Sequence, residues 1–291
     1  MSLRADVVIV HWNQPDACAE TAARFTAIES VSNVVVVDNG SRKDELLNLE
    51  SSLPPEVSII EVGFNSGFGP AVNRGWEDWL SRSGSEDWCV VAPHDAIVSA
   101  DTIRKMLDTA RERPQAGLLS ADVGDGSRPI VDHVFGPILI PALGGSGFEE
   151  VDYPHGTLMM VNKRALRTVG LFDERYFSYC EEADLGLRAK RAGFEVGLVR
   201  GAMVKNPMVS TSLPIADYLM ERNTVLLIHE HFGRRKAAMR FAIMVGQFVL
   251  WSILPNRRTD YWSFRARALA IADVARRRWG PPPPSLHEPV S

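Results

Sequence analysis

The chain has 291 residues, of which 45% are hydrophobic and 23% charged, as is ordinary for one large globular domain or two modest ones. A net charge of -4 without a basic, aromatic-rich stripe gives no case for nucleic-acid binding. Three cysteines at unrelated spacings predict no disulfide framework or zinc site and fit a reducing cytoplasm. We also expect no membrane-spanning helix, because the longest apolar run, Phe241 to Leu254, is a turn or two too short to cross a bilayer.

The first part of the chain alternates between strand and helix patterns. Continuous apolar runs, typical of strands covered on both faces, predict strands over Ala5–Val10, Asn33–Val37, Val57–Val62 and Trp88–Ala92. Helical spacing predicts helices over Pro15–Ser30, Pro70–Arg82 and Asp101–Arg113, the last with Asp101 as its N-cap. This alternation indicates βαβ units and a mostly parallel, Rossmann-like α/β sheet.

The second part is less regular and ends in helices. Residues 124–147 are rich in Gly and Pro and predict loops with short strands, followed by a strand over Gly156–Val161 and a short helix over Lys163–Val169. Helical patterns then cover Ile215–His231, Arg234–Leu254 and Tyr261–Trp279. We therefore expect a domain at 1–212, a helical region at 213–279, and a proline-rich tail at 280–291 that is extended or disordered.

Polar side chains follow several of the predicted strands. Asp38, Asn65 and Asp95 each lie just beyond a strand end, and His11 and Asn13 follow the first strand. Ligands of open α/β sheets bind at the carboxyl ends of strands, so we expect these residues to converge. An ordinary Asx-turn is the alternative for Asp38, and a structural hydrogen bond is the alternative for His11.

A glycine-rich segment, EVGFNSGFGPAVNRGW, follows the third predicted strand. Gly67 and its neighbouring glycines allow the backbone to approach a sugar or diphosphate closely, and Asn65 and Asn73 flank them. Such a loop can also be structural. Its position after a strand favours ligand binding.

The most informative segment is GLFDERYFSYCEEADLGLRAKRAGFEVGLVR, from Gly170 to Arg200. Glu181, Glu182 and Asp184 follow an aromatic cluster and precede a short amphipathic helix. Carboxylates this close repel one another, and the aromatic neighbours add a desolvation cost, which indicates a functional site. The alternative is a helix N-terminus, where acids offset the helix dipole.

This segment resembles the acceptor-side motif of inverting family 2 glycosyltransferases, the GT-A fold enzymes that include bacterial rhamnosyltransferases. The residues in register are Phe172, Asp173, Glu174, Phe177, Tyr179, Glu181, Asp184, Leu185 and Arg188. VVIVHWNQPD, VVVVDNGS and the glycine-rich segment resemble three further family elements in the same order. Ordered matches of this kind are specific, whereas each motif alone is weak.

The resemblance implies a GT-A fold with a C-terminal helical appendage. It also implies transfer of a sugar from a nucleotide diphosphate donor to a hydroxyl with inversion, dTDP-rhamnose being the best guess and UDP-sugars close competitors. Asp38 would accept the N3–H of a pyrimidine base. The donor-binding residues implied are His11, Asn13, Asp38, Asn65, Gly67, Asn73, Asp95 and Arg222.

The resemblance also implies a divalent cation, Mg²⁺ or Mn²⁺. Asp95 occupies the place of the family's D-x-D motif, but PHDA contains only one acid. Asn206 stands where the family has a further histidine ligand. Lys205 or Arg222 would be the alternative source of positive charge beside the diphosphate.

The catalytic base implied is Glu182, in a position where the family has aspartate. Asp184 is the alternative base, although it could instead cap the helix or hold Arg188. The remaining acceptor-side residues expected are His155, Gly156, Tyr179 and Glu181.

The last helices are basic and amphipathic. They predict either peripheral contact with an anionic membrane near a lipid-linked acceptor, or packing on the domain or a homodimer interface. The acceptor stays open between a glycan, a lipid-linked molecule and a small molecule, and the location between the cytoplasm and the inner face of the cell membrane. A non-catalytic nucleotide-sugar-binding scaffold is the main alternative function. A nucleotidyltransferase is disfavoured because HWNQPD lacks a glycine-rich basic loop.

Overall fold

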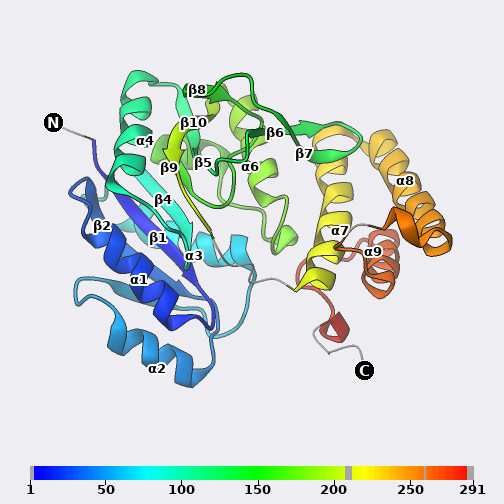
Figure 1. The fold of residues 1–291 in the computed structure, drawn as a ribbon, viewed down its shortest axis with the longest axis horizontal. Helices are drawn as coiled ribbons and strands as arrows, with labels where there is room; N and C mark the ends of the chain where they lie inside the picture. Colours follow the sequence, from blue (N-terminus) through cyan, green and yellow to red (C-terminus); the bar gives the residue numbers. More distant parts are fainter. Residues whose placement is uncertain (1–2, 207–211, 259, 287–291) are drawn as a thin grey trace.

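A mixed sheet forms the centre of the fold in the computed structural model, which describes residues 3–206, 212–258 and 260–286. Within these residues the sheet has eight strands in the order β3-β2-β1-β4-β9-β5-β10-β8 (Figure 1). They are β1 (Ala5–His11), β2 (Val31–Asp38), β3 (Ser58–Glu61), β4 (Trp88–Pro93), β5 (Ala116–Asp122), β8 (Gly147–Glu150), β9 (Met159–Asn162) and β10 (Glu195–Met203). Only β8 and β9 run antiparallel to their neighbours, which confirms the predicted mixed, mostly parallel sheet.

Helices cover both faces of this sheet. Val7 and Ile9 of β1 pack toward one face, and Val8 and Val10 toward the other. The first face is covered by α1 (Pro15–Thr26), α2 (Lys43–Ser52) and α4 (Ala100–Glu112), and the second by α3 (Phe68–Ser81), α5 (Lys163–Val169) and α6 (Glu181–Arg191). Burial on both faces explains why the strands read as unbroken apolar runs.

Three local predictions differ from the structure. Helix α2 is not predicted by the sequence pattern, because it buries only Leu49 and so has a weak apolar face, and strand β5 is not predicted either. The N-cap of α4 is Ser99, whose Oγ accepts a hydrogen bond from the Thr102 N–H at 3.2 Å, and not Asp101. Asp101 pairs instead with the basic side chains of the next turn.

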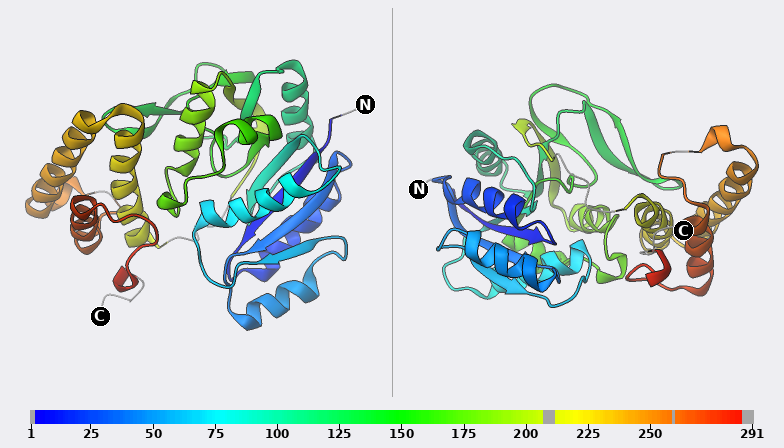
Figure 2. Two further views of the ribbon diagram at one scale, coloured as in Figure 1. Left: turned by 180° about the vertical axis from the view of Figure 1, so that it is seen from behind. Right: turned by 60° about the horizontal axis from the view of Figure 1, so that its bottom comes forward.

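A hairpin and three helices complete the molecule. Strands β6 (Ser127–Asp132) and β7 (Gly136–Pro141) form the hairpin within the region predicted as loops and short strands. Helices α7 (Leu213–Phe232), α8 (Arg234–Ile253) and α9 (Phe264–Arg276) lie at the end of the molecule remote from α2 (Figures 1 and 2).

The C-terminal tail is partly ordered, in contrast to the expectation. Pro284–Leu286 forms a 3-10 helix, and Leu286 is buried in the core of the three C-terminal helices. Residues 287–291 lie outside the described part of the chain.

The expectation that no segment is long enough to span a membrane is wrong for α8. Among the described residues, this one helix is long and apolar enough to do so by length and composition. The helix has 20 residues because it begins at Arg234, in the basic segment that precedes the apolar run starting at Phe241. Only 17% of its apolar window is buried inside the protein.

Candidate active site

The carboxyl ends of β1 and β2 bring His11 and Asp38 together. The two residues are register partners, and His11 Nδ1 lies 2.9 Å from Asp38 Oδ1. The other ring nitrogen, Nε2, accepts the Gln14 N–H at 3.1 Å, so Nδ1 carries the proton and donates it to Asp38. Because His11 is fully buried with both nitrogens engaged, it acts as a support for Asp38 beneath the predicted donor site.

Asp38 is held in its ionised form. Burial disfavours its charge, but hydrogen bonds from His11 and Ser41 outweigh that effect and lower its pKa. The Ser41 N–H donates to Oδ2 at 3.1 Å. Asn13 joins the neighbouring loops: its N–H donates to Ser41 Oγ at 2.9 Å, and its Oδ1 accepts the Arg42 N–H at 2.8 Å. A fixed, charged acceptor therefore lies at the end of β2.

Asn39 organises the glycine-rich loop, a role that the sequence analysis missed. Its Oδ1 accepts the Ser66 N–H at 2.9 Å, and its Nδ2 donates to the Gly67 carbonyl at 3.1 Å. Asn65 is engaged within the same loop, because its Oδ1 accepts the Gly67 N–H at 3.0 Å. The DNG sequence predicts a turn at Asn39, but only the fold shows that this asparagine hydrogen-bonds a loop 26 to 28 residues further along the chain.

The glycine-rich loop packs directly on the acidic motif. Gly67 has a φ of 96°, and a Cβ at this position would lie 2.2 Å from the Phe177 carbonyl oxygen. The Phe68 N–H donates to Ser178 Oγ at 2.9 Å, and the Gly69 N–H donates to the Phe177 carbonyl at 3.3 Å. The predicted donor and acceptor segments thus form one continuous structure, which requires glycine at position 67.

Asn73 clamps α3 to the start of the acidic motif. Its side chain donates to the Phe172 carbonyl and accepts the Phe172 N–H, both at 3.0 Å. A further bond from its Nδ2 reaches Glu174 Oε1 at 3.2 Å. Asn73 is buried, and these contacts make it a support that joins α3 to the acidic motif.

A strained turn leads into α6. Phe177, Tyr179 and Cys180 have φ values of 67°, 68° and 75°, a backbone region that costs roughly 1–3 kcal/mol for each non-glycine residue. The fully buried Asn223 of α7 holds this turn, since its Nδ2 lies 2.8 Å from three backbone carbonyl oxygens. The carbonyls belong to Tyr176, Ser178 and Tyr179. The sequence analysis named the adjacent Arg222 and missed Asn223.

Asp184 is a structural ion-pair residue. Its carboxylate lies 2.8 Å from the Arg188 guanidinium and 2.7 Å from His231 Nε2, and the side chain is 4% exposed. Burial opposes its charge, but the hydrogen bond from His231 and the charge of Arg188 prevail and lower its pKa. The structure thus shows the alternative in which Asp184 holds Arg188.

Glu181 and Glu182 are neighbouring carboxyl groups at the start of α6, the first buried and the second half-buried. Desolvation and the neighbouring Glu182 raise the pKa of Glu181 well above its usual range, and its Oε2 is buried without a hydrogen-bond partner. Desolvation raises the pKa of Glu182 to about 7. We infer that Glu181 is protonated at neutral pH and that Glu182, which is only half-buried, carries the titrating charge.

The loop at 152–157 closes over α6 at two glycines. A Cβ on Gly186 would lie 2.3 Å from the Asp152 carbonyl oxygen, and a Cβ on Gly156 would lie 2.2 Å from Glu182 Oε1. Next to Gly156, His155 Nδ1 lies 3.0 Å from Thr157 Oγ1, and burial lowers the pKa of this histidine. The structure therefore brings Gly156 to the Glu182 carboxylate, with His155 next to it in the chain.

We expect Gly156→Ala to impair catalysis with little loss of stability. The new methyl group meets the far end of a flexible side chain, so the Glu182 carboxylate would move and the backbone would stay in place. A displacement near 1 Å can lower turnover by about 10²-fold. Turnover and thermal unfolding of Gly156→Ala should be compared with those of Gly145→Ala, a position in open space. Equal turnover in the two variants would contradict the contact.

Asp95 and Asn206 come from adjacent segments. Ile97 and Lys205 form a β-bridge, with the Ile97 N–H donating to the Lys205 carbonyl at 2.8 Å. Asp95 is 4% exposed, whereas Asn206 is exposed. The described residues contain no group of three or more His, Cys, Asp or Glu side chains that could hold a metal ion.

Arg222, predicted to bind the donor, is buried among contacts within the protein. It is 1% exposed and donates to the Tyr218 hydroxyl at 2.9 Å and to the Gly280 carbonyl at 2.7 Å. Its Nε donates to Asn223 Oδ1 at 3.0 Å. These contacts connect α7 to the C-terminal segment, which is a structural role.

Comparison with known proteins places this geometry in a family. Residues 6–170 match glycosyl transferase family 2. The N-acetylglucosaminyl-diphospho-decaprenol L-rhamnosyltransferase of Mycobacterium tuberculosis is 27% identical over 255 residues, which are 76% of this chain and 83% of the relative. The low-salt glycan biosynthesis hexosyltransferase Agl10 of Haloferax volcanii is 25% identical over 254 residues, which are 81% of each chain.

Two solved structures share the fold. GalNAc-T7 with UDP, GalNAc and Mn²⁺ aligns with a TM-score of 0.60 at 12% identity, over 94% of this chain and 56% of its own, so the chain spans little more than half of GalNAc-T7. The mannosyltransferase PcManGT of Pyrobaculum calidifontis with GDP-Man and Mn²⁺ aligns with a TM-score of 0.56 at 12% identity, over 96% of this chain and 87% of its own. The predicted GT-A fold is thereby confirmed. Because the family match covers more than half of the sequence, the protein belongs to glycosyl transferase family 2 and is a glycosyltransferase.

Proposed function

We propose that the protein is an inverting glycosyltransferase in which Glu182 is the catalytic base. The observation that carries this proposal is the difference between the three acids of α6. Asp184 is ion-paired, Glu181 is buried with a raised pKa and a carboxyl oxygen without a hydrogen-bond partner, and Glu182 is half-buried with a pKa of about 7. A base whose pKa is near the working pH is the most effective at proton transfer.

In the proposed step Glu182 removes the proton of an acceptor hydroxyl. The hydroxyl oxygen forms a bond to the anomeric carbon of the donor sugar from the face opposite the leaving group. The bond from that carbon to the diphosphate oxygen breaks, and its electron pair leaves with the nucleoside diphosphate. Attack from the opposite face inverts the anomeric configuration.

For the donor we propose dTDP-L-rhamnose, with a UDP-sugar as the competitor. The ionised Asp38 is suited to accept the N3–H of thymine or uracil, since each carboxylate oxygen keeps a lone pair beside its bond to His11 or Ser41. The rhamnosyltransferase relative supports rhamnose as the sugar.

We also propose that Mg²⁺ or Mn²⁺ accompanies the donor diphosphate. Asp95 would supply a carboxylate ligand, and Asn206, from the adjacent segment, an amide oxygen. The GalNAc-T7 and PcManGT structures described above both contain Mn²⁺. When bound, the cation would neutralise charge on the departing diphosphate.

The proposed acceptor is a lipid-linked glycan intermediate, used at the inner face of the cell membrane. The Mycobacterium tuberculosis relative, whose name includes a decaprenol-linked acceptor, supports this class. A free glycan and a small molecule are the competing acceptors.

A donor panel tests the proposed function. We expect dTDP-rhamnose with Mn²⁺ to stabilise the folded protein by about 2.7 kcal/mol at a hundredfold excess over Kd, and slow hydrolysis of the donor to follow. In Asp95→Asn the increment due to Mn²⁺ should disappear, while Asp108→Asn on the distant α4 should behave as wild type. Donor binding without hydrolysis or transfer would instead favour the non-catalytic scaffold. Absence of binding by any dTDP-, UDP- or GDP-sugar would contradict both.

A further inference from the structure

The solvent-facing side of α8 is apolar, the reverse of an ordinary surface helix. Beyond the first turn, every exposed residue of this helix is apolar: Ala238, Met239, Ala242, Gly246, Val249, Leu250 and Ile253. They recur at intervals of three and four residues and so form one stripe along the helix, hereafter the α8 stripe. Ile253 at its end is 71% exposed.

Beyond the first turn, Arg240 and Gln247 of α8 point inward. Arg240 is 7% exposed, and its Nη2 lies 2.8 Å from Glu221 Oε2 on α7. Gln247 lines a pocket together with Asp217 and Glu221 of α7. A helix that turns its charged and amide groups inward and its apolar groups outward leaves its outer face suited to a non-aqueous environment.

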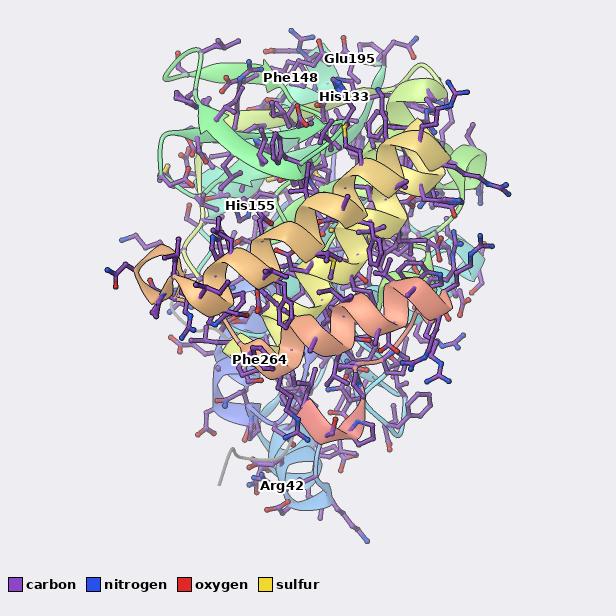
Figure 3. All side chains as sticks on the ribbon, turned by 90° about the vertical axis from the view of Figure 1, so that its right-hand side faces the viewer. Arg42, His133, Phe148, His155, Glu195 and Phe264 are labelled. Carbon is purple, nitrogen blue, oxygen red and sulfur yellow. The ribbon has the colours of Figure 1, made fainter. Side chains whose placement is uncertain are left out.

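Aromatic rings gather beside the carboxyl end of the α8 stripe. Phe248 and Phe264 have ring centroids 4.9 Å apart, and Trp251 and Trp262 have centroids 5.7 Å apart. Phe264, at the start of α9, is 58% exposed, and Figure 3 shows it beside α8 on the same face of the molecule. Amphipathic aromatic side chains are enriched where protein meets the headgroup region of a bilayer.

The charge of this region favours an anionic partner. Residues 234–280 contain eleven Arg or Lys and two Asp, although the whole chain has a net charge of -4. The exposed basic residues of this region are Arg234, Arg235, Arg258, Arg265, Arg276, Arg277 and Arg278. A second copy of the chain docked over α8 would place this positive charge against itself, whereas an anionic lipid surface complements it.

We propose that α8 and the start of α9 dock on an anionic lipid bilayer, with the α8 stripe buried at the boundary between headgroups and acyl chains. The helix lies along the surface and does not cross it. Its inner face packs on α7 and α9 through Ala237 and Met244, and crossing would carry the Arg240–Glu221 ion pair into hydrocarbon. This docking rests on α8 and α9 alone and does not depend on the proposed sugar transfer.

Vesicle sedimentation without donor or acceptor tests the docking. The full chain should bind vesicles of equal parts phosphatidylglycerol and phosphatidylcholine, and bind phosphatidylcholine alone far more weakly. Leu250→Ser combined with Ile253→Ser should lower the affinity more than about ten-fold, because two exposed apolar side chains are removed from the stripe. Arg234→Gln and Arg235→Gln should each lower it about five-fold. The matched control is Leu47→Ser on α2, a leucine that is 55% exposed, and it should bind as wild type.

Three results would overturn the proposal. The first is that the double variant and the wild type bind the anionic vesicles equally well, or that neither binds them. The second is a concentration-dependent dimer that the double variant abolishes, which would identify a second copy as the occupant. The third is resistance of the bound protein to alkaline carbonate extraction, which would show that α8 crosses the bilayer. Donor binding and thermal unfolding of the same variants should match wild type, so a failure of docking is distinguishable from a failure of the proposed function.

Discussion

Glu182→Gln should lower turnover by about 10²- to 10⁴-fold and leave donor affinity unchanged, because the variant keeps the shape of the side chain but cannot take a proton. The Glu182 carboxylate lies against Gly156, whereas His11 holds Asp38 and Asn39 holds the glycine-rich loop. Transfer rates and donor calorimetry on the same preparations would measure the two effects separately.

The same residue should govern two opposite pH dependences. Wild-type kcat/KM should rise with pH through about 7, as Glu182 loses its proton and becomes a competent base. Stability should fall as pH rises from about 4.5 to about 7, because in this window the folded state binds the proton more tightly than the unfolded state does. Glu182→Gln removes the buried charge, so it should unfold at a higher temperature than wild type at pH 8 while being nearly inactive.

Glu181→Gln is the matched control for this prediction. Because Glu181 is already neutral in our interpretation, an amide in its place should preserve most of the turnover. If Glu181→Gln were inactive and Glu182→Gln active, the roles of the two residues would be reversed. Full activity of both variants would exclude this pair as the source of the base.

Asn223→Ala should lower turnover by about 10²-fold, although residue 223 lies on α7 and carries no group for proton transfer. The substitution leaves three backbone carbonyls without their donor and releases a turn with three positive φ values directly before Glu181 and Glu182. Relaxation of that turn would shift the base relative to the acceptor, and misplacement of this kind is costly. Stability should also fall, by about 1–3 kcal/mol, because buried acceptors are left unsatisfied.

Asn223 is identified as a positioning residue if its substitution lowers turnover and leaves donor affinity unchanged. Donor affinity should be retained, because the contacts of Asp38 and Asn39 do not involve α7. Asn223→Asp should be more damaging than Asn223→Ala, since it places a carboxylate against the same carbonyl oxygens. Asn48→Asp, at an exposed position on α2, serves as the control for the charge change. Unchanged turnover in folded Asn223→Ala would contradict the role.

Local sequence pattern predicts some parts of the candidate site and not others. The strands could be predicted because burial on both faces leaves continuous apolar runs such as Val7–Val10. The acidic motif could be predicted because its residues are contiguous in the sequence. The roles of Asn39 and Asn223 could not be predicted, because the residues next to an asparagine do not show which groups its side-chain amide will hydrogen-bond. Their partners lie 26 to 28 and 44 to 47 residues away in the chain.

By itself, the sequence determined the mostly parallel α/β sheet and the order of the motifs, and it predicted the first turn of α6 as the position of the proposed base. These depend on local periodicity and on contiguous residues. Only the tertiary structure separated Glu182 from Asp184, because the group that engages Asp184 includes His231, 47 residues further on. Only the tertiary structure showed that α8 turns its apolar side outward, because the sequence gives a helix two faces and the packing against α7 and α9 decides which one is buried.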